Sequence, residues 1–301
     1  MRAERRQAQG MAAASLTSAS ASPASTAGPH VVDVLIAERA PGLTRSPVWP
    51  VVRAPLHGLL HYGAARRMAD AVAGLPGREA LEHVSDLLSL QTTADGVENL
   101  PATGRCIVVC NHPTGIADGI AMFDVVERRR ADSIYFANAD ALRVSARLDE
   151  IVIPVEWVLE KRTREKTRRT LDAARAAFEA ERCVVMFPAG RLARVEKGLL
   201  TDPEWAPTAV SLARKYQAPI VPVHMTGPAS TLFHLFDRFS RELRDITLFH
   251  EMLNKTGKAF HLTVGQLIPP DAFGPDAAAE TLRLKAFVER RLAGDPAAVF
   301  A

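Results

Sequence analysis

Short apolar runs alternate with longer segments of helical periodicity over the last two thirds of the chain. The runs are rich in β-branched residues and cover residues 106–110, 133–137, 151–155, 183–187, 219–223 and 261–267. Between them, apolar residues recur at the spacing of a helix face, as in residues 139–148, 163–180 and 206–216. This alternation predicts an α/β domain with a largely parallel sheet, flanked by helices and buried on both faces. Such sheets bind ligands at the carboxyl ends of their strands.

The N-terminal third has a different pattern. We expect a disordered tail over residues 1–30, a helical N-terminal segment over residues 31–100, and the α/β domain over residues 101–301. The tail is rich in Ala and Ser and lacks the continuous apolar core of a secretory signal. Helical spacing predicts helices over residues 31–40, 51–75 and 78–90. Pro50 and Pro55 are expected to break the second of these helices.

Composition excludes several classes of protein. The chain has 301 residues, of which 48% are hydrophobic and 24% charged, which rules out a disordered, collagen-like or disulfide-scaffold protein. Cys106, Cys110 and Cys183 each lie in an apolar run, so we expect buried thiols in a reducing compartment. No apolar stretch approaches the roughly 18 residues needed to span a bilayer. Basic residues are not interleaved with aromatic ones, so nucleic acid is not an expected partner.

The first candidate for chemistry directly follows the run at residues 106–110. It reads Asn111-His112-Pro113-Thr114-Gly115-Ile116-Ala117-Asp118, which places a His and an Asp on either side of a turn. A neutral imidazole near pH 7 is suited to deprotonate an alcohol, and a carboxylate can fix its tautomer. The structural alternative is a His in a turn, with Asp118 capping the next helix.

The second candidate follows the run at residues 183–187. It reads Phe187-Pro188-Ala189-Gly190-Arg191-Leu192-Ala193-Arg194. Glycine allows the backbone to approach a ligand closely, and arginine side chains suit an anionic group. The alternative is an ordinary turn with solvated arginines.

Together, these two segments resemble the lysophospholipid (glycerolphosphate) acyltransferase family, which includes bacterial 1-acylglycerol-3-phosphate acyltransferases. The first block of that family pairs Asn-His with an Asp a few residues later, and its third block is a Phe-Pro-Glu-Gly-Thr-Arg type segment. A proline-containing strand over residues 218–223 is similar to the fourth block. The resemblance covers roughly residues 31–270 and implies a glycerolphosphate acyltransferase-like α/β fold.

The resemblance also implies a mechanism. His112 would take the proton from an acceptor hydroxyl, which attacks the thioester of acyl-CoA or acyl-carrier protein, and Asp118 would orient His112. Backbone N–H groups of the Pro-Thr-Gly turn would stabilise the oxyanion, and neither a metal nor another cofactor is needed. The residues expected to bind substrate are Asn111, Thr114, Gly115, Arg162, Pro188, Gly190, Arg191 and Arg194.

Three positions depart from the common family pattern. Five residues separate His112 from Asp118 where the family usually has four, so an extra residue has to be absorbed around Gly115. In the third block, Ala189 replaces the Glu that the family uses for the acceptor. Arg191 stands at the usual Thr position and Leu192 at the usual Arg position. This form of the first block looks like the hemolysin-like or ornithine-lipid-type subgroup.

A basic stretch lies near the region that resembles the family's second block, where Lys161 or Arg162 is the expected counterpart of the acceptor-binding Arg. Residues 160–169 contain six basic and two acidic side chains. This stretch suits an anionic membrane surface or a phosphorylated acyl carrier, the alternative being a solvated helix start. Residues 51–60 are the candidate docking segment, unless that helix packs on the core. Trp157 and Trp205 are candidates for an acyl pocket, although core packing is the more common role of tryptophan.

The function we expect is transfer of a fatty acyl group from acyl-CoA or acyl-carrier protein to a hydroxyl of a lysophospholipid or related lysolipid. This enzyme would work in membrane lipid synthesis, in the cytoplasm and peripheral to the inner face of the membrane. A thioesterase-like or lipase-like hydrolase and a non-catalytic lipid-binding protein are the alternatives. The acceptor, the donor carrier, the acyl-chain preference and the oligomeric state stay open, as does the choice of arginine for the head group.

Overall fold

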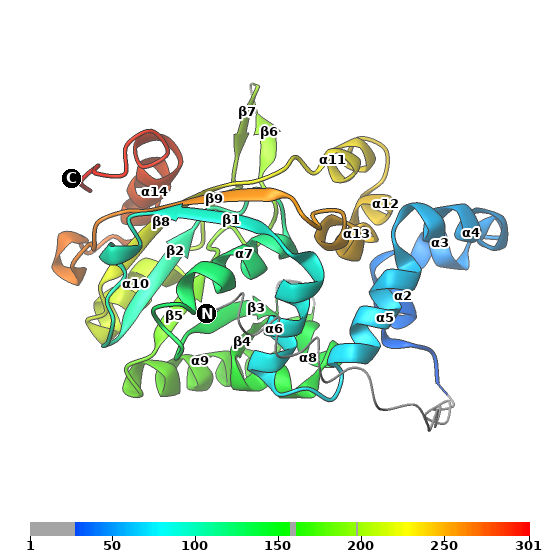
Figure 1. Cartoon of the computed structure of the whole chain (residues 1–301), viewed down its shortest axis with the longest axis horizontal. Helices are drawn as coiled ribbons and strands as arrows, with labels where there is room; N and C mark the ends of the chain where they lie inside the picture. Colours follow the sequence, from blue (N-terminus) through cyan, green and yellow to red (C-terminus); the bar gives the residue numbers. More distant parts are fainter. Residues whose placement is uncertain (1–27, 157–160, 197) are drawn as a thin grey trace, which may run out of the picture.

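One large sheet organises the protein (Figure 1), and the computed structural model describes residues 28–156, 161–196 and 198–301. The strand order is β1 (Gln91–Asp95), β9 (Ala259–Val264), β8 (Ile220–Thr226), β2 (Cys106–Cys110), β5 (Cys183–Met186), β3 (Ile134–Asn138) and β4 (Val152–Val155). From β8 to β4 all neighbours are parallel, whereas β9 pairs antiparallel with β8 and parallel with β1. The predicted α/β fold with a largely parallel sheet is confirmed.

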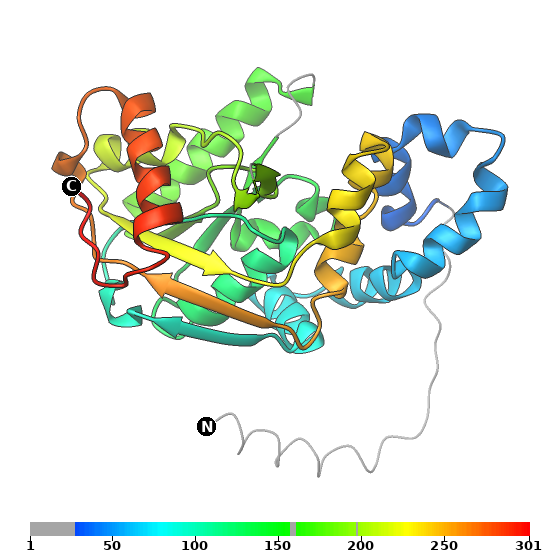
Figure 2. The same cartoon turned by 90° about the horizontal axis from the view of Figure 1, so that it is seen from above.

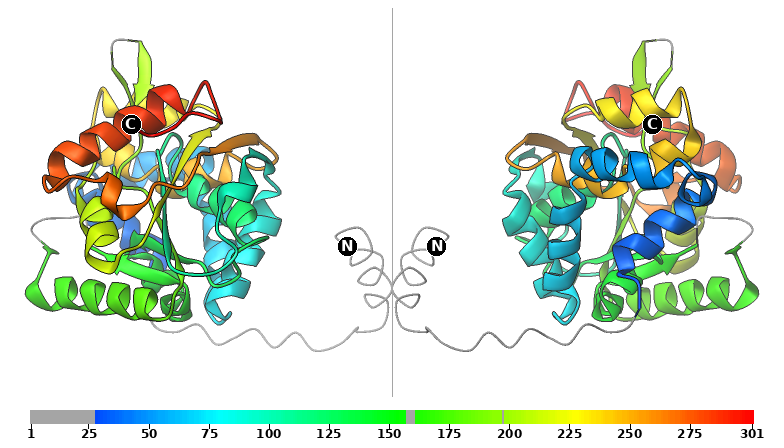
Figure 3. Two further views of the ribbon diagram at one scale, coloured as in Figure 1. Left: turned by 90° about the vertical axis from the view of Figure 1, so that its left-hand side faces the viewer. Right: turned by 90° about the vertical axis from the view of Figure 1, so that its right-hand side faces the viewer.

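Helices cover both faces of this sheet (Figure 3). Alternate residues of β2 show why, since Val108 belongs to one buried apolar cluster while Ile107 and Val109 belong to another. The first cluster contains residues of α5 (Tyr62–Val72), α6 (Gly77–Leu88), α7 (Ile116–Val126) and α13 (Leu248–Leu253). The second contains residues of α9 (Arg164–Glu179), α10 (Thr208–Tyr216), α14 (Ala277–Ala286) and the π-helical turn Phe287–Arg291.

The N-terminal helices pack beside the sheet at one end (Figure 1). They are α2 (Val31–Arg39), α3 (Pro41–Arg45) and α4 (Trp49–Leu59), followed by α5 and α6. The expectation that proline breaks residues 51–75 is wrong, because Pro55 lies inside α4. The break falls at His61, whose φ of 57° is left-handed. The helical segment also ends earlier than residue 100, since Gln91–Asp95 is strand β1.

Shorter elements complete the chain. The expected helix over residues 139–148 is divided into α8 (Ala141–Val144) and a 3-10 turn (Ala146–Glu150), because Ser145 between them is extended. The others are α11 (Thr231–Asp237), α12 (Arg241–Asp245) and the 3-10 turns Val97–Asn99 and Pro270–Ala272. A small antiparallel hairpin of β6 (Arg194–Glu196) and β7 (Leu199–Thr201) projects beyond the large sheet (Figure 1).

The structure bears on the expectations for the three cysteines and for membrane-spanning helices. Cys106, Cys110 and Cys183 are free and buried, as expected. Among the described residues, no helix has both the length and the apolar character needed to cross a bilayer.

Candidate active site

The two sequence segments meet at the carboxyl edge of the parallel strands. The first follows β2 and the second follows β5, and these strands are neighbours in the sheet. The ring of His112 lies 4.7 Å from that of Phe187, measured between centroids. The rule that parallel sheets place their sites at this edge therefore holds for both segments.

His112 and Asp118 form a hydrogen-bonded pair. The distance from His112 Nδ1 to Asp118 Oδ2 is 2.8 Å, and the Asp118 side chain is fully buried. The same oxygen accepts the backbone N–H groups of Thr114 and Gly115 at 2.9 Å and 3.1 Å. Asp118 Oδ1 accepts the Thr114 hydroxyl at 2.5 Å. Asp118 thus both orients the imidazole and caps α7, so the two readings of this residue describe one arrangement.

Gly115 absorbs the extra residue between His112 and Asp118. Its φ of 103° and ψ of −141° belong to a backbone region that is essentially restricted to glycine. A Cβ added there would lie 3.1–3.3 Å from the side chain of Leu192. Leu192 occupies the position at which the family usually has Arg. Two departures from the family pattern are therefore in contact with each other.

The expected oxyanion role of the Pro-Thr-Gly turn is wrong. Proline has no N–H group, and the N–H groups of Thr114 and Gly115 already donate to Asp118. A donor for a developing oxyanion has to come from another part of the site.

Asn111 and Thr114 support the site instead of lining it. The Asn111 side-chain amide exchanges two hydrogen bonds with the backbone of Met225 on β8, at 2.7 Å and 2.9 Å. Thr114 is buried and bonded to Asp118. Both residues tie the loop that carries His112 to its surroundings, which differs from the substrate-binding position expected for them.

An apolar cavity of about 340 Å³ opens beside His112. Its walls come from α2, α5, α6, α7, β3, α8 and α13, and most of the lining side chains are aliphatic or aromatic. His112, Gly115, Gly190 and Arg191 all line it. The volume lies within the range typical of small-molecule sites. The structure therefore brings four of the predicted site residues to one cavity.

The other predicted residues of the second segment and of the basic stretch lie elsewhere. Arg194 begins β6, within electrostatic range of His234 and Asp237 on α11. The Arg162 guanidinium donates to the backbone oxygen of Glu156 at 3.3 Å and is exposed. The Pro188 carbonyl accepts the N–H of Ala206. None of these three predicted residues lines the cavity, so their expected contact with substrate is not supported by the geometry.

Of the two tryptophans considered for an acyl pocket, Trp205 lies within the described residues. Trp205 is buried in the second apolar cluster, and its indole N–H donates to Asp202 at 2.8 Å. Core packing is its role, and it does not line the cavity. Trp157 lies outside the described residues.

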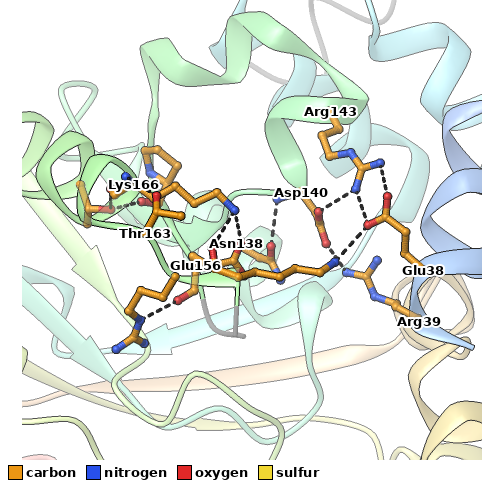
Figure 4. A network of polar contacts seen from close by, with 12 residues as sticks. Glu38, Arg39, Asn138, Asp140, Arg143, Glu156, Thr163 and Lys166 are labelled. Atoms are coloured by element: carbon orange, nitrogen blue, oxygen red, sulfur yellow. Dashed lines mark hydrogen bonds and ion pairs between the residues drawn. The ribbon is translucent and has the colours of Figure 1, made fainter. Parts of the chain in front are cut away.

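A polar rim, formed by Arg39, Asn138, Asp140 and Arg191, borders the otherwise apolar cavity. Arg39 donates to Asp140 at 2.7 Å, and Arg143 joins Asp140 to Glu38 (Figure 4). Of the rim residues, Arg191 was predicted, whereas Arg39, Asn138 and Asp140 were missed by the sequence reasoning. Asn138 ends β3 and Asp140 follows it, so the rule that singled out His112 was also the signal for them.

Ion pairs fix the side chains of the polar rim. Hydrogen bonds from Arg143, with a further one from Lys161, lower the pKa of Glu38 to about 2, although partial burial opposes this. Lys161 lies 3.1 Å from Glu38, and Lys166 lies 2.7 Å from Glu156 (Figure 4). Two cations of the basic stretch are therefore engaged within the protein and not presented wholly to a partner. Among the described residues, no group of three or more His, Cys, Asp or Glu side chains is arranged to hold a metal ion.

A buried carboxylate that orients an imidazole at the edge of an apolar cavity is the site of an enzyme able to use general-base chemistry on an apolar substrate. A sequence model of the family described as Acyltransferase matches residues 34–291. The chain belongs to this family and is an acyltransferase. The resemblance drawn from the two sequence segments is thereby confirmed.

Two curated relatives are lyso-glycine lipid O-acyltransferases. The protein of Phocaeicola vulgatus is 29% identical over 203 residues, which is 65% of this chain and 71% of the relative. The protein of Bacteroides thetaiotaomicron is 28% identical over 203 residues, covering 65% and 73% respectively. A comparison of structures aligns 86% of this chain with 97% of the 1-acyl-sn-glycerophosphate acyltransferase PlsC from Thermotoga maritima, at 14% identity and a TM-score of 0.47.

Proposed function

We propose that this acyltransferase moves a fatty acyl group from a thioester donor to a hydroxyl of a lysolipid. The observation that carries the proposal is the bonded His112–Asp118 pair at the wall of an apolar cavity. A fatty acyl chain is the substrate that such a cavity accommodates best, because aliphatic walls offer it burial without unpaired polar groups. Acyl-CoA and acyl-carrier protein are both thioesters of this kind.

The geometry gives each residue a step. His112 removes the proton of the acceptor hydroxyl as its oxygen attacks the thioester carbonyl. Asp118 stabilises the imidazolium that forms, and the imidazolium then supplies the proton to the departing thiolate. Developing negative charge on the carbonyl oxygen needs a donor other than the N-terminal end of α7, because the Asp118 carboxylate already caps that end. Arg191, exposed at the rim, is the donor that we assign to this charge or to the head group.

Residues 187–194, which resemble the third block of the family, bear on the identity of the acceptor. Ala189 and Leu192 replace the Glu and Arg that the family pattern uses for a phosphate-bearing acceptor, and Leu192 packs against Gly115 instead. The two curated relatives are named for lyso-glycine lipid. We therefore expect a lysolipid with an amino-acid head group to be a better acceptor than lysophosphatidate. The carboxylate of such a head group matches the arginines of the rim.

The test is donor thiol release by purified protein. Acyl-CoA and acyl-carrier protein are each offered with lyso-glycine lipid, lyso-ornithine lipid, lysophosphatidate and no acceptor. We expect release that depends on an amino-acid lysolipid. Equal release without an acceptor would identify a hydrolase, and tight lipid binding without release would identify a binding protein. Either result would overturn the proposal.

The docking of this enzyme on a membrane is a second part of the proposal. No residue of α4 is buried, and Val48 and Val51 beside and within it are 53% and 77% exposed. This surface also carries Arg53, which suits anionic lipid. We place the enzyme at the cytoplasmic face of the membrane, where both thioester donors occur.

Flotation with anionic liposomes tests the docking. Deletion of the whole helical segment is unsuitable, because α5 and α6 belong to the main apolar cluster. The Val51→Glu variant instead removes the burial of one exposed valine, roughly 1.5 kcal/mol, and is expected to weaken binding about tenfold. Leu282→Glu, at a residue 58% exposed on the distant α14, is the matched control and should bind normally (Figure 2). Unchanged flotation of Val51→Glu would remove α4 from the docking surface.

A further inference from the structure

The backbone of His112 is held on both sides by the segment that contains the β6–β7 hairpin. Its N–H donates to both carboxylate oxygens of Asp202, at 3.0 Å and 3.1 Å. Its carbonyl accepts the N–H of Ala193 at 2.9 Å. Ala193 directly precedes β6 and Asp202 directly follows β7, so the two ends of the hairpin enclose the peptide of His112. We call these three hydrogen bonds the His112 clasp.

Asp202 is itself fixed from several directions. Only 4% of it is exposed, and the Trp205 indole N–H donates to Oδ2 at 2.8 Å. Its backbone N–H donates to Glu289 at 2.7 Å, and Lys285 pairs with Glu289 at the same distance. The C-terminal helical elements thus set the position of Asp202, which in turn sets the position of His112.

The surroundings of Asp202 shift its pKa in both directions. Burial raises its pKa to about 6, while the His112 N–H and the Trp205 indole oppose this by favouring the carboxylate. Glu289 raises the same pKa through its charge. The other titratable groups that face this region are Cys110 and Asp118, and Asp202 and Asp118 both act on the buried Cys110 thiol. Asp202 is therefore a buried carboxyl group with a pKa raised to about 6, in direct contact with the backbone of His112.

We propose that Asp202 is a positioning residue for acyl transfer, whose carboxylate fixes the peptide of His112 and supports the imidazolium that forms there. This inference rests on the proposed function of His112. A charged acceptor in a buried place bonds an N–H group more strongly than a neutral one does. It also adds a second negative charge beside His112, after that of Asp118, at the moment when the ring becomes positive. Asp202 acts through His112 and has no need to touch the substrate.

Kinetics of two variants test the positioning role. In Asp202→Asn the amide NH2 group faces either the His112 N–H or the Trp205 indole N–H, both of which are donors. We expect kcat to fall 10- to 100-fold while the KM for the donor stays within about threefold. Asp271→Asn, at an exposed carboxylate on the 3-10 turn Pro270–Ala272, is the matched control, and it should keep the wild-type kcat.

The pH profile separates this role from a merely structural one. In the wild type, the acid side of the kcat profile should contain the protonation of Asp202, with a midpoint near pH 6. In Asp202→Asn this protonation should be absent, so the shape of the acid side should change. A variant with the wild-type kcat and the wild-type profile would overturn the proposal, as would a fall in kcat with no change in the shape of the profile.

Nuclear magnetic resonance of the wild-type protein tests the clasp without any measurement of activity. In the wild type, the Trp205 indole N–H and the His112 backbone N–H signals should shift together with a midpoint near pH 6. The Trp205 shift should persist in His112→Ala, because its source is Asp202. Signals that stay flat between pH 5 and 7.5 would overturn the clasp. A clasp that titrates in a protein inactive on every lysolipid would refute the proposed function alone.

Discussion

Replacement of Gly115 by alanine attacks the point at which the extra residue of the first segment is accommodated. A φ of 103° forces an alanine into a region that costs about 1–3 kcal/mol. The new Cβ would also lie 3.1 Å from Leu192, and such overpacking adds about 1 kcal/mol. We therefore expect Gly115→Ala to lose about 2–4 kcal/mol of unfolding free energy. Because Asp118 is held by the N–H of Gly115, a shift of this turn should also lower kcat by at least tenfold.

Chemical denaturation and thiol release, measured on the same preparations, check this expectation. Leu192→Ala should relieve the contact but not the backbone strain, so the double variant should be more stable than additivity predicts, by about 0.5–1 kcal/mol. Gly104→Ala is the matched control. Gly104 also has a positive φ, of 82°, but its added Cβ would meet only Glu181, at 3.9 Å. The control should lose stability and keep its kcat. If Gly115→Ala were as stable and as active as the wild type, this explanation of the extra residue would be refuted.

Three further changes probe the site and its rim. In Asp118→Asn, the donors around Oδ2 should orient the amide oxygen toward His112, so that the tautomer of His112 is kept and only the charge is lost. Because a charge-assisted hydrogen bond is worth about 1.5–3 kcal/mol, kcat should fall roughly 10- to 150-fold. An unchanged kcat would contradict the role of Asp118. Glu38→Gln should be less stable than the wild type at pH 7 by at most about 1 kcal/mol, because the group is partly exposed. The pKa of Glu38 in the folded protein is lowered from 4.5 to about 2, so the difference in stability should be complete above pH 4.5 and vanish as the pH falls toward 2. If urea-unfolding curves showed a difference that grows on acidification, the ion pairs of Glu38 would be refuted. Gly119 lines the cavity, and a Cβ added to it would meet open space. Gly119→Ala should therefore gain up to about 1 kcal/mol of stability, whereas Gly119→Leu should obstruct the acyl chain and lower turnover. Normal turnover of Gly119→Leu would place the acyl chain elsewhere.

The central strands of the fold were predictable from the sequence because they are buried on both faces. Continuous apolar runs such as Cys106–Cys110 and Cys183–Met186 have one simple physical reading. Strand β1 was missed because Gln91–Asp95 is polar and lies at the edge of the sheet, where exposed side chains carry no such signal. The β6–β7 hairpin was missed because its strands are only three residues long and mostly exposed.

The hydrogen-bonded pair of His112 and Asp118 was predictable because both residues lie in one short segment that follows a buried strand. The clasp on His112 was not, since Asp202 is 90 residues away from His112 in the chain and no local pattern marks it. The same holds for Arg39, which reaches the cavity only because α2 packs beside α8. The opposite error was made with Asn111, which belongs to the predicted segment but bonds the backbone of β8. Position in a motif predicted which loop matters and could not show which way each side chain faces.

The two departures in contact suggest why this chain tolerates an altered family pattern. The turn at Gly115 lies against the second segment, where the aliphatic side chain of Leu192 packs beside it. A charged guanidinium at that place would be packed against a glycine backbone and lose hydration. We therefore interpret the extra residue and the loss of the usual Arg as two changes that accommodate each other.

The measurement that tests the central claim most directly is the turnover of His112→Ala in acceptor-dependent thiol release. His83→Ala, which alters an exposed histidine on α6, is the matched control, and circular dichroism establishes that both variants are folded. General-base catalysis contributes about 10²–10⁴-fold, so His112→Ala should lose at least 100-fold in kcat while His83→Ala keeps the wild-type value. A folded His112→Ala protein with near-normal turnover would contradict the account.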